Sequence, residues 1–280
     1  MFEIVRKEQL NNYMTHMVLK APMIAQKAKA GQFVILRTDE FAERIPITIF
    51  DTDRIKGTID IIYQKVGVAT YKLDKKSEGD FIEDILGPLG RSSNLGNYKK
   101  VMLVSGGVAV ATMYPIAKSL FKKGCKTDVV LGFRNKELII LEDKIKQFSS
   151  SLDIVTNDGS NGNRGLVTDV LTHKLKNGEN YDMVFSVGPL PMMKAVCDVT
   201  KKYSIKSIVS MTAIMIDGTG MCGGCRLSVG GETKFACIDG PDFDGHEVDF
   251  DEAIIRNRMF KIQEDNAREK YCNLFKGETI

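Results

Sequence analysis

The sequence predicts a β-barrel, then an α/β domain with a parallel sheet, then a C-terminal loop region suited to a metal cluster, in 280 residues. Three observations predict this order. Short β-like runs fill the first hundred residues, strands alternate with helical patterns from Lys99 onward, and three cysteines lie within sixteen residues between Cys222 and Cys237. We expect boundaries at residues 1–97, 98–216 and 217–280, since a chain of this length can form more than one core.

The residue pattern of the N-terminal region predicts a small antiparallel barrel or sandwich. Its apolar or alternating runs are separated by turn-forming residues such as Ala30-Gly31 and Lys56-Gly57, and several short strands at this spacing are typical of that architecture. The expected strands are Phe2–Val5, Tyr13–Leu19, Gln32–Leu36, Ile47–Phe50 and Thr58–Tyr63.

From Lys99 the pattern changes to strands that alternate with helices, which predicts βαβ units and a parallel sheet. The expected strands are Val101–Val104, Asp128–Leu131, Leu152–Val155, Met183–Val187 and Ser207–Ile216. The expected helices run from the Gly106-Gly107 turn to about Lys123, and over Leu138–Phe148, Val167–Leu175 and Leu190–Tyr203. A Gly- and Cys-rich loop follows from Asp217 to Cys237, then a turn at Asp239–Gly245 and a charged helix over Ala253–Tyr271.

Composition excludes several classes of protein. Hydrophobic residues make up 43% and charged residues 27% of the chain, and the net charge is only +3. No basic block with interleaved aromatics points to nucleic acid. Met1–Leu10 lacks the apolar core of a signal peptide, and no apolar run reaches the ~18 residues of a membrane helix. We therefore expect a cytoplasmic protein that binds neither nucleic acid nor membrane.

The strongest motif is Asp217-x4-Cys222-x2-Cys225-x11-Cys237. It has the spacing of a plant-type [2Fe–2S] site, with aspartate in the first ligand position. Glycines between these residues allow the backbone to wrap closely around a cluster. A zinc site, or buried thiols beside a flexible loop, would also account for the cysteines. An aspartate beside glycines is also a common turn residue.

The three remaining cysteines lie far from this loop and are expected to be inert thiols. They are Cys125, Cys197 and Cys272.

A second motif indicates a nucleotide site at one edge of the parallel sheet. Gly106-Gly107 follows the first strand of that sheet, Asp158 follows the third, and Gly188-Pro189 follows the fourth. Such turns let a pyrophosphate approach backbone amides at a helix start. The match to the dinucleotide fingerprint is imperfect, and a packing glycine pair is the alternative. Arg134 follows the second strand, where it could meet the 2′-phosphate of NADP(H).

A third group lies in the barrel region. Arg44, Pro46 and Thr48 share one segment, and a glycine-led helix start at Gly67 carries Thr70 three residues on. An arginine and a helix start could hold a diphosphate. A surface arginine and an ordinary turn would give the same pattern.

Taken together, these motifs resemble the ferredoxin–NADP reductase superfamily over nearly the whole chain. The likeness is greatest to the branch with the electron-transfer subunit of dihydroorotate dehydrogenase and the small subunit of NADH-dependent ferredoxin–NADP oxidoreductase. The motifs occur in the family order: Ala30-Gly-Gln-Phe33, Arg44–Thr48, Gly67–Thr70, Leu86-Gly-Pro-Leu-Gly90, Val104–Ala109, Gly188-Pro189 and the cysteine loop.

The resemblance implies that the barrel binds FAD, with the Thr48 hydroxyl near flavin N5. In this chain Ile45 stands directly before Pro46, where the family usually has arginine, and Arg44 is one residue earlier. The residues implied near FAD are Arg44, Pro46, Thr48, Tyr63, Gly67 and Thr70. Those implied at the nicotinamide nucleotide are Gly106, Gly107, Arg134, Asp158, Gly188 and Pro189.

The resemblance also implies a function and a partner. Electrons would pass between NAD(H) or NADP(H), FAD and the [2Fe–2S] cluster without a catalytic acid or base, and family likeness favours NAD(H). They would pass on to a larger subunit with FAD and [4Fe–4S] clusters, and through it to ferredoxin. The dihydroorotate branch has cysteine where Asp217 stands, which favours the oxidoreductase small subunit. The alternatives are the dihydroorotate dehydrogenase subunit, a zinc-containing nucleotide-binding module and a non-catalytic nucleotide-binding regulator.

Overall fold

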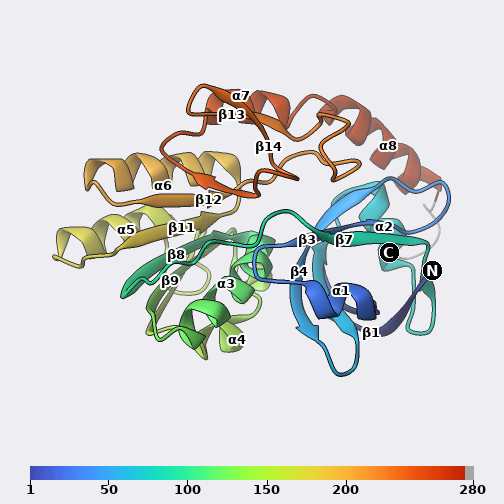
Figure 1. Ribbon diagram of the computed structural model, residues 1–280, viewed down its shortest axis with the longest axis horizontal. Helices are drawn as coiled ribbons and strands as arrows, with labels where there is room; N and C mark the ends of the chain where they lie inside the picture. Colours follow the sequence, from blue (N-terminus) through green and yellow to red (C-terminus); the bar gives the residue numbers. More distant parts are fainter. Residues whose placement is uncertain (275–280) are drawn as a thin grey trace.

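The structure is a computed structural model that describes residues 1–274 (Figure 1). It contains a seven-stranded antiparallel sheet that is nearly closed into a barrel, a six-stranded mostly parallel sheet, and a two-stranded hairpin. The barrel-then-parallel-sheet order predicted from the sequence is confirmed. No helix within residues 1–274 is long and apolar enough to span a membrane. The expectation for Cys272 lies outside the described side chains.

The barrel strands are ordered β6-β1-β2-β5-β4-β3-β7. Side chains alternate between the interior and the outside, so that Ile59, Ile61 and Tyr63 of one strand all point inward and are buried. The elements are β1 (Phe2–Asn11), β2 (Met14–Lys20), α1 (Pro22–Lys27), β3 (Phe33–Arg37), β4 (Ile45–Asp53), β5 (Thr58–Gln64), α2 (Val68–Asp74), β6 (Phe81–Ile82) and β7 (Asp84–Leu89).

The second sheet has the order β10-β9-β8-β11-β12-β15, with all neighbours parallel except β12 and β15. Helices cover both of its faces. Odd-numbered residues of β8 such as Val101 and Leu103 pack with α3 and α4, and even-numbered ones such as Met102 and Val104 pack with α5. The elements are β8 (Lys100–Gly106), α3 (Val110–Lys122), β9 (Lys126–Phe133), α4 (Glu142–Lys146), β10 (Ser151–Thr156), α5 (Val167–Lys176), β11 (Met183–Val187), α6 (Leu190–Lys202) and β12 (Ser207–Ser210).

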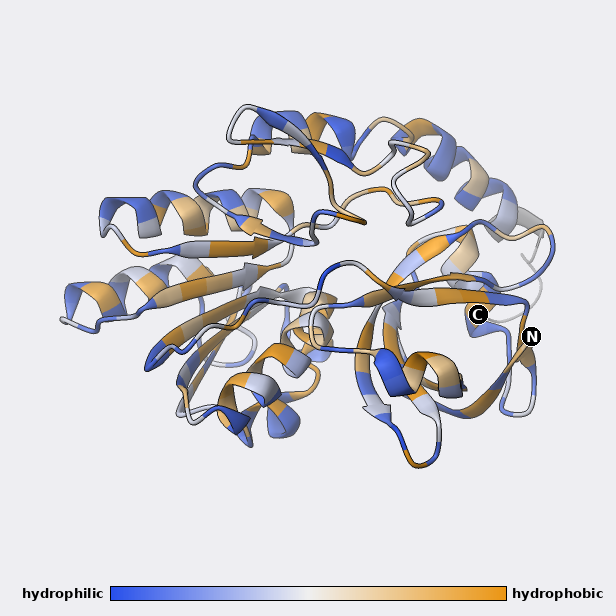
Figure 2. Ribbon diagram, in the orientation of Figure 1, coloured by the Kyte–Doolittle hydropathy of each residue, from blue (hydrophilic) through white to orange (hydrophobic). Residues whose placement is uncertain are grey.

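The C-terminal segment packs over the edge of this sheet and against the barrel. Phe33 and Ile35 of the barrel share one buried cluster with Cys225, Leu227 and their neighbours. The elements are the hairpin β13 (Arg226–Val229) and β14 (Glu232–Phe235), the edge strand β15 (Asp242–Asp244), and the helices α7 (Phe250–Arg256) and α8 (Lys261–Leu274). In Figure 2 the strands β8 and β9 are largely hydrophobic, whereas the outlying α8 is largely hydrophilic.

Three expected elements differ in the structure. The helix expected over 138–148 is only five residues long, because Leu141 has a left-handed φ of +62° just before α4. The strand expected to reach Ile216 ends at Ser210, because β11 offers only four paired positions and Met211 bonds to Pro241 instead. The charged helix expected over 253–271 is two helices, α7 and α8.

Three strands lie in segments that were expected to be loops. Gly230 and Gly231 both have positive φ and join β13 to β14, the geometry of a tight hairpin turn. The strand β15 occupies part of the expected turn at 239–245 and pairs antiparallel with β12.

Candidate functional site

The cysteine loop holds its four candidate ligands as two pairs. Cys225 and Cys237 are buried, and their Sγ atoms lie 3.3 Å apart. Cys222 is exposed, and its Sγ lies 3.5 Å from Oδ1 of Asp217. A disulfide requires sulfurs about 2.05 Å apart, so Cys225 and Cys237 are free thiols. Two ligands about 2.3 Å from one tetrahedral metal lie roughly 3.8 Å apart, close to the separation within each pair.

Backbone amides fix Asp217 at the start of the loop. Its Oδ1 accepts from the amide of Thr219 at 3.0 Å, and its Oδ2 accepts from that of Cys222 at 2.8 Å. Partial burial raises the pKa of this carboxyl, but the two amides outweigh burial and hold its pKa below the ordinary value. The side chain is therefore an anion beside Cys222 that also closes a turn.

Burial has the opposite net effect on the pKa of Cys237, which forms the inner thiol pair with Cys225. It raises the pKa of Cys237 well above its ordinary value, and the neighbouring Cys225 raises it further. A buried thiol of this kind becomes a thiolate only when a cation replaces its proton.

The loop requires its glycines for steric reasons. Gly218 and Gly220 have φ values of +72° and +87°. A Cβ on Gly218 would lie 2.6 Å from Leu89 of β7, and one on Gly220 would lie 2.7 Å from Ile238. The loop is therefore pressed against the outside of the barrel (Figure 1, the orange segment between β12 and β13).

The donor set fits a cluster with two metal ions. Two ligand pairs on one loop match a [2Fe–2S] centre, in which each iron takes two protein ligands. Within residues 1–274, no three His, Cys, Asp or Glu side chains are grouped closely enough to hold a single metal ion.

A central cavity of about 80 Å³ lies where the barrel, the parallel sheet and the C-terminal segment meet. Pro46 and Thr48 of β4 line it, and the Thr48 hydroxyl lies 2.9 Å from that of Thr112 in α3. The other lining residues are Gly31, Phe33, Val187, Ser210, Met211, Thr212, Ala213, Met215 and Pro241. This volume holds only two or three waters, so a flavin ring would enter only if the walls moved apart.

Arg44 is exposed and does not line this cavity. It borders a separate cavity of about 250 Å³ together with Arg37 and Leu86. The structure therefore places Arg44, which precedes β4, apart from Pro46 and Thr48.

Gly67 and Thr70 stand at the start of α2. A Cβ on Gly67 would meet nothing within 4 Å, so space for a ligand is open there. The Thr70 hydroxyl accepts from the amides of Val66 and Gly67 and caps the helix. A helix of seven residues is short, and its start is not an anion site by itself.

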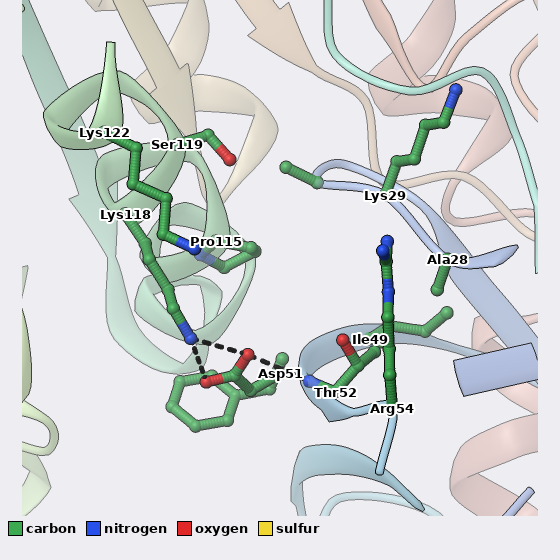
Figure 3. A pocket seen from close by; sticks show the side chains of 12 residues that line it. Ala28, Lys29, Ile49, Asp51, Thr52, Arg54, Pro115, Lys118, Ser119 and Lys122 are labelled. Carbon is green, nitrogen blue, oxygen red and sulfur yellow. Dashed lines mark hydrogen bonds and ion pairs between the residues drawn. The ribbon is translucent and has the colours of Figure 1, made fainter. Parts of the chain in front are cut away.

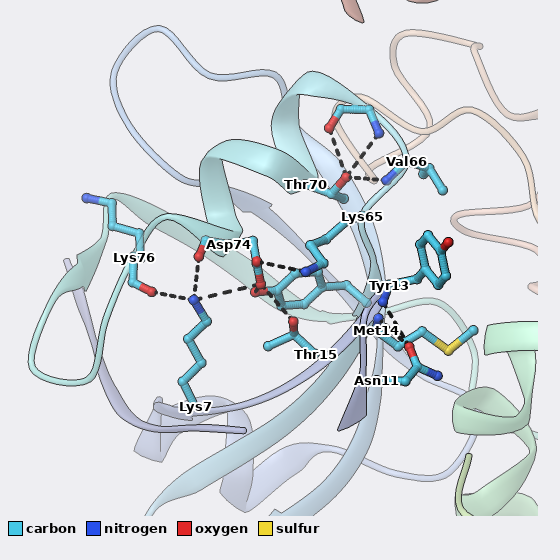
Figure 4. A network of polar contacts seen from close by, with 12 residues as sticks. Lys7, Asn11, Tyr13, Met14, Thr15, Lys65, Val66, Thr70, Asp74 and Lys76 are labelled. Carbon is cyan, nitrogen blue, oxygen red and sulfur yellow. Dashed lines mark hydrogen bonds and ion pairs between the residues drawn. The ribbon is translucent and has the colours of Figure 1, made fainter. Parts of the chain in front are cut away.

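Tyr63 lies inside the barrel and not with the other residues expected near FAD. Its side chain is 3% exposed, and its hydroxyl donates to Asp74 at 3.0 Å. Figure 4 shows Asp74 at the centre of a network with Thr15, Lys7 and Lys65. The period of two along β5 explains this inward position, because Ile59 and Ile61 also face the interior.

The two glycine turns of the parallel sheet come together in the structure. A Cβ on Gly106 would lie 3.0 Å from Pro189, and one on Gly188 would lie 3.1 Å from the Gly106 amide nitrogen. Gly107 has a φ of +63°, and a Cβ there would meet nothing within 4 Å. The turns thus leave an open approach to the backbone at the carboxyl ends of β8 and β11, where α/β sheets bind nucleotides.

Arg134 and Asp158 lie along the same edge, after β9 and β10. The amide of Asp158 donates to the carbonyl of Arg134 at 3.3 Å. The Ser160 hydroxyl and amide hold the pKa of Asp158 below its ordinary value, so this exposed carboxylate orders its own loop. No carboxylate occupies residues 134–136, directly after β9.

Several residues of these sites were not identified from the sequence. Thr112 lies in the middle of a helical pattern and carries no distinguishing signal. Met211–Ala213 line the central cavity because the expected strand ends early. Ser93 and Asp242 hydrogen-bond to each other across 149 positions, which only the tertiary structure brings together.

Comparisons with known proteins match both C-terminal parts of the chain. Residues 103–198 match the oxidoreductase NAD-binding domain, and residues 212–249 match the iron–sulfur cluster binding domain of dihydroorotate dehydrogenase B. The second match covers all four candidate ligands.

Relatives match over nearly the full length. A Thermotoga maritima protein described as a homolog of the dihydroorotate dehydrogenase B (NAD(+)) electron transfer subunit is 42% identical, over 96% of this chain and 95% of its own. An uncharacterized protein in the adh 3′ region of Clostridium beijerinckii is 44% identical, over 96% and 93%. In a solved structure of an NADH-dependent reduced ferredoxin-NADP oxidoreductase, one chain is 40% identical with a TM-score of 0.91, over 96% and 97% of the two chains.

Proposed function

Because the chain belongs to the family of dihydroorotate dehydrogenase B electron-transfer subunits and their homologues, we propose that it passes electrons between NAD(H), FAD and a [2Fe–2S] cluster. The observation that carries the proposal is the pairing of Asp217 with Cys222 and of Cys225 with Cys237 on one loop. The iron–sulfur family match supports a cluster rather than zinc at these residues.

The chain's own residues position the cofactors in this proposal. Pro46 and Thr48 would hold the flavin ring at the central cavity once its walls have moved apart, and Thr48 would offer its hydroxyl to the ring. The turns at Gly106-Gly107 and Gly188-Pro189 hold the nicotinamide nucleotide at the adjoining sheet edge. When bound, the nicotinamide supplies two electrons as hydride, and the flavin divides this pair for the one-electron cluster.

The cysteine loop lies close to the central cavity, where the flavin ring is proposed to bind. Gly218 packs on Ile35 and Leu89, and Phe33 of the same strand β3 lines the cavity. Arg44, Gly67 and Thr70 remain candidates for the rest of FAD. Arg134 and Asp158 remain candidates for the adenosine end of the nucleotide.

The outer side of the loop is the proposed exit for electrons. Met221 is 90% exposed and Cys222 is exposed, whereas Cys225 and Cys237 are covered by the chain. A partner subunit that docks over Cys222 would receive electrons without any rearrangement of the inner pair. We propose a larger subunit with FAD and [4Fe–4S] clusters that reacts with ferredoxin, in a cytoplasmic complex.

A second candidate function is the electron-transfer subunit of dihydroorotate dehydrogenase B itself. The match of residues 212–249 and a 36% identical subunit of Clostridium perfringens favour it. Purification of the native complex separates the two, because the second candidate requires a dihydroorotate-oxidising partner. The first requires a partner that reduces ferredoxin or NADP.

The proposal is tested on purified protein reconstituted with FAD, iron and sulfide. We expect NADH to bleach the flavin absorbance and to drive reduction of a one-electron dye. A non-catalytic regulator would bind NADH without bleaching, and a zinc module would reduce no dye. Either result would contradict electron transfer by this chain.

Replacing Gly107 with valine should weaken NADH binding by at least about tenfold. The new side chain would occupy the open space at the sheet edge, and its left-handed backbone angle adds roughly 1–2 kcal/mol of strain. Gly178→Val is the matched control, since Gly178 also has positive φ and open space but ends α5 far from this edge. NADH titration followed by flavin bleaching checks the difference, and equal losses in both variants would contradict a nucleotide site at Gly107.

Two substitutions at Asp217 separate its role as a ligand from its role in the turn. Asp217→Asn keeps an oxygen for the turn but removes the anion, so the cluster should become labile. Asp217→Cys restores an anionic ligand of softer type and should keep the cluster with a changed potential and EPR spectrum. A cluster in Asp217→Asn with unaltered spectrum and potential would leave Asp217 as a turn residue only.

A further inference from the structure

A third cavity, larger than the two at the candidate site, lies between the barrel and α3. Its volume is about 490 Å³, within the range of small-molecule sites. One wall comes from the segment 28–30 after α1 and from the end of β4, and the other comes from Pro115, Lys118, Ser119 and Lys122 of α3 (Figure 3). None of the residues expected at FAD, the nicotinamide nucleotide or the cluster lines it.

The lining of this cavity carries a surplus of positive charge. Lys29 and Arg54 stand on the barrel wall, and Lys118 and Lys122 stand on the α3 wall (Figure 3). The single lining carboxylate, Asp51, is already paired with Lys118, at 2.6 and 2.8 Å.

Three of the four cations therefore remain uncompensated. Within residues 1–274, no ion pair joins Lys29, Arg54 or Lys122 to a carboxylate. Three like charges that face one concave space repel each other, and an anion that enters it relieves this repulsion.

The uncharged part of the lining favours a compact and polar ligand. Thr52 and Ser119 supply hydroxyls, and Ala28 and Ala30 leave room. The only aromatic ring in the lining is that of Phe50, which is 1% exposed and stacked on Tyr114 at 4.4 Å. No aromatic face is therefore free to stack a nucleobase, and recognition would depend on charge.

We propose that this cavity binds a polyphosphate group, either inorganic or the 5′-polyphosphate of a nucleotide whose base remains outside. Arginine and lysine around a concave site are suited to phosphate oxygens. An acidic protein surface is less well matched, because these cations line a hollow rather than a raised face. Since the cations come from both walls, the ligand joins the barrel to α3 and holds these two parts together.

Binding of inorganic tripolyphosphate to the cofactor-loaded protein tests the proposal, by calorimetry at about 0.15 M salt, where weak surface attraction is screened. We expect one saturable site per chain. Arg54→Ala and Lys122→Ala should each weaken binding about tenfold, as expected for loss of one charge-assisted contact. Lys202→Ala is the control, because Lys202 is exposed on α6, on the other face of the parallel sheet.

ATP tested beside tripolyphosphate distinguishes the two sources of the phosphate. Equal affinity supports a site for the polyphosphate alone, and tighter binding of ATP supports a nucleotide. Thermal unfolding provides a second readout, since a ligand of the native state should raise the Tm of the wild type and of Lys202→Ala more than that of Lys122→Ala. Absence of saturable binding, or equal weakening in Lys202→Ala, would overturn the proposal.

Discussion

Replacing Cys237 with alanine is expected to leave the protein without an iron–sulfur cluster. Cys237 is 2% exposed, and its sulfur lies 3.3 Å from that of Cys225, so the two thiolates would hold one iron between them. The variant leaves that iron with a single protein ligand inside a buried pocket. Iron and acid-labile sulfide should fall to background, together with dye reduction by NADH.

The Cys237→Ala variant should retain electron transfer from NADH to the flavin, which comes before reduction of the cluster. NADH should still bleach the flavin, because the residues proposed for both cofactors lie outside the cysteine loop. Cys197→Ala is the matched control: Cys197 is a buried thiol at 5% exposure, and its sulfur lies near the Ser207 hydroxyl rather than another thiol. A Cys237→Ala protein that kept full iron and sulfide would show that the cluster is held elsewhere.

Replacing Asp242 with asparagine should remove a large part of the pH dependence of stability. Asp242 is partly buried where Ser93 and β12 meet. Its Oδ2 accepts from the Ser93 hydroxyl, and its Oδ1 is enclosed by protein without a hydrogen-bond partner. Burial raises the pKa of Asp242 to about 6, against the lowering effect of that hydroxyl. The folded protein therefore holds this proton more tightly than the unfolded chain does.

The sign of the effect follows from this raised pKa. The contribution of Asp242 to the free energy of unfolding is fully favourable below the unfolded pKa near 4. It is lost as the pH rises through 6. A shift of this size corresponds to about 3 kcal/mol in the free energy of unfolding. Between pH 4 and pH 8 the wild type should lose about that much relative to Asp242→Asn, which cannot ionise.

Urea unfolding of both proteins at several pH values measures this difference. Asp244→Asn serves as a control on the same strand, because the Oδ1 of Asp244 accepts from the His246 amide, whereas the Oδ1 of Asp242 is enclosed without a partner. It should follow the wild type at every pH. Parallel curves for the wild type and Asp242→Asn would show that Asp242 is not a buried acid in solution.

The parts of the fold that depend on local residue patterns could be predicted from the sequence. Alternation of apolar residues located five of the seven barrel strands, β1 to β5, but not β6 or β7. Met183–Val187 was predicted with its observed bounds. The apolar run at 208–216 misled the prediction, because continuous hydrophobicity does not distinguish a strand from a buried irregular segment. The hairpin at Gly230-Gly231 carried a recognisable turn signal that the cysteine pattern obscured.

For the candidate sites, local patterns predicted the identity of residues but not their contacts with distant parts of the chain. Spacing alone pointed to Asp217, Cys222, Cys225 and Cys237, but not to which of them lie together. The period of two along β5 could have shown that Tyr63 points inward with Ile61. The contact of Thr48 with Thr112 and that of Ser93 with Asp242 join distant parts of the chain, so no local pattern encodes them.

Chemical analysis of the reconstituted protein tests the central claim most directly. Iron, zinc and acid-labile sulfide are measured per chain, and EPR spectra are recorded before and after addition of NADH. We expect about two irons and two sulfides per chain and a paramagnetic signal that appears only after NADH is added. One zinc per chain without labile sulfide, or a cluster that NADH leaves oxidised while the flavin is bleached, would contradict the account.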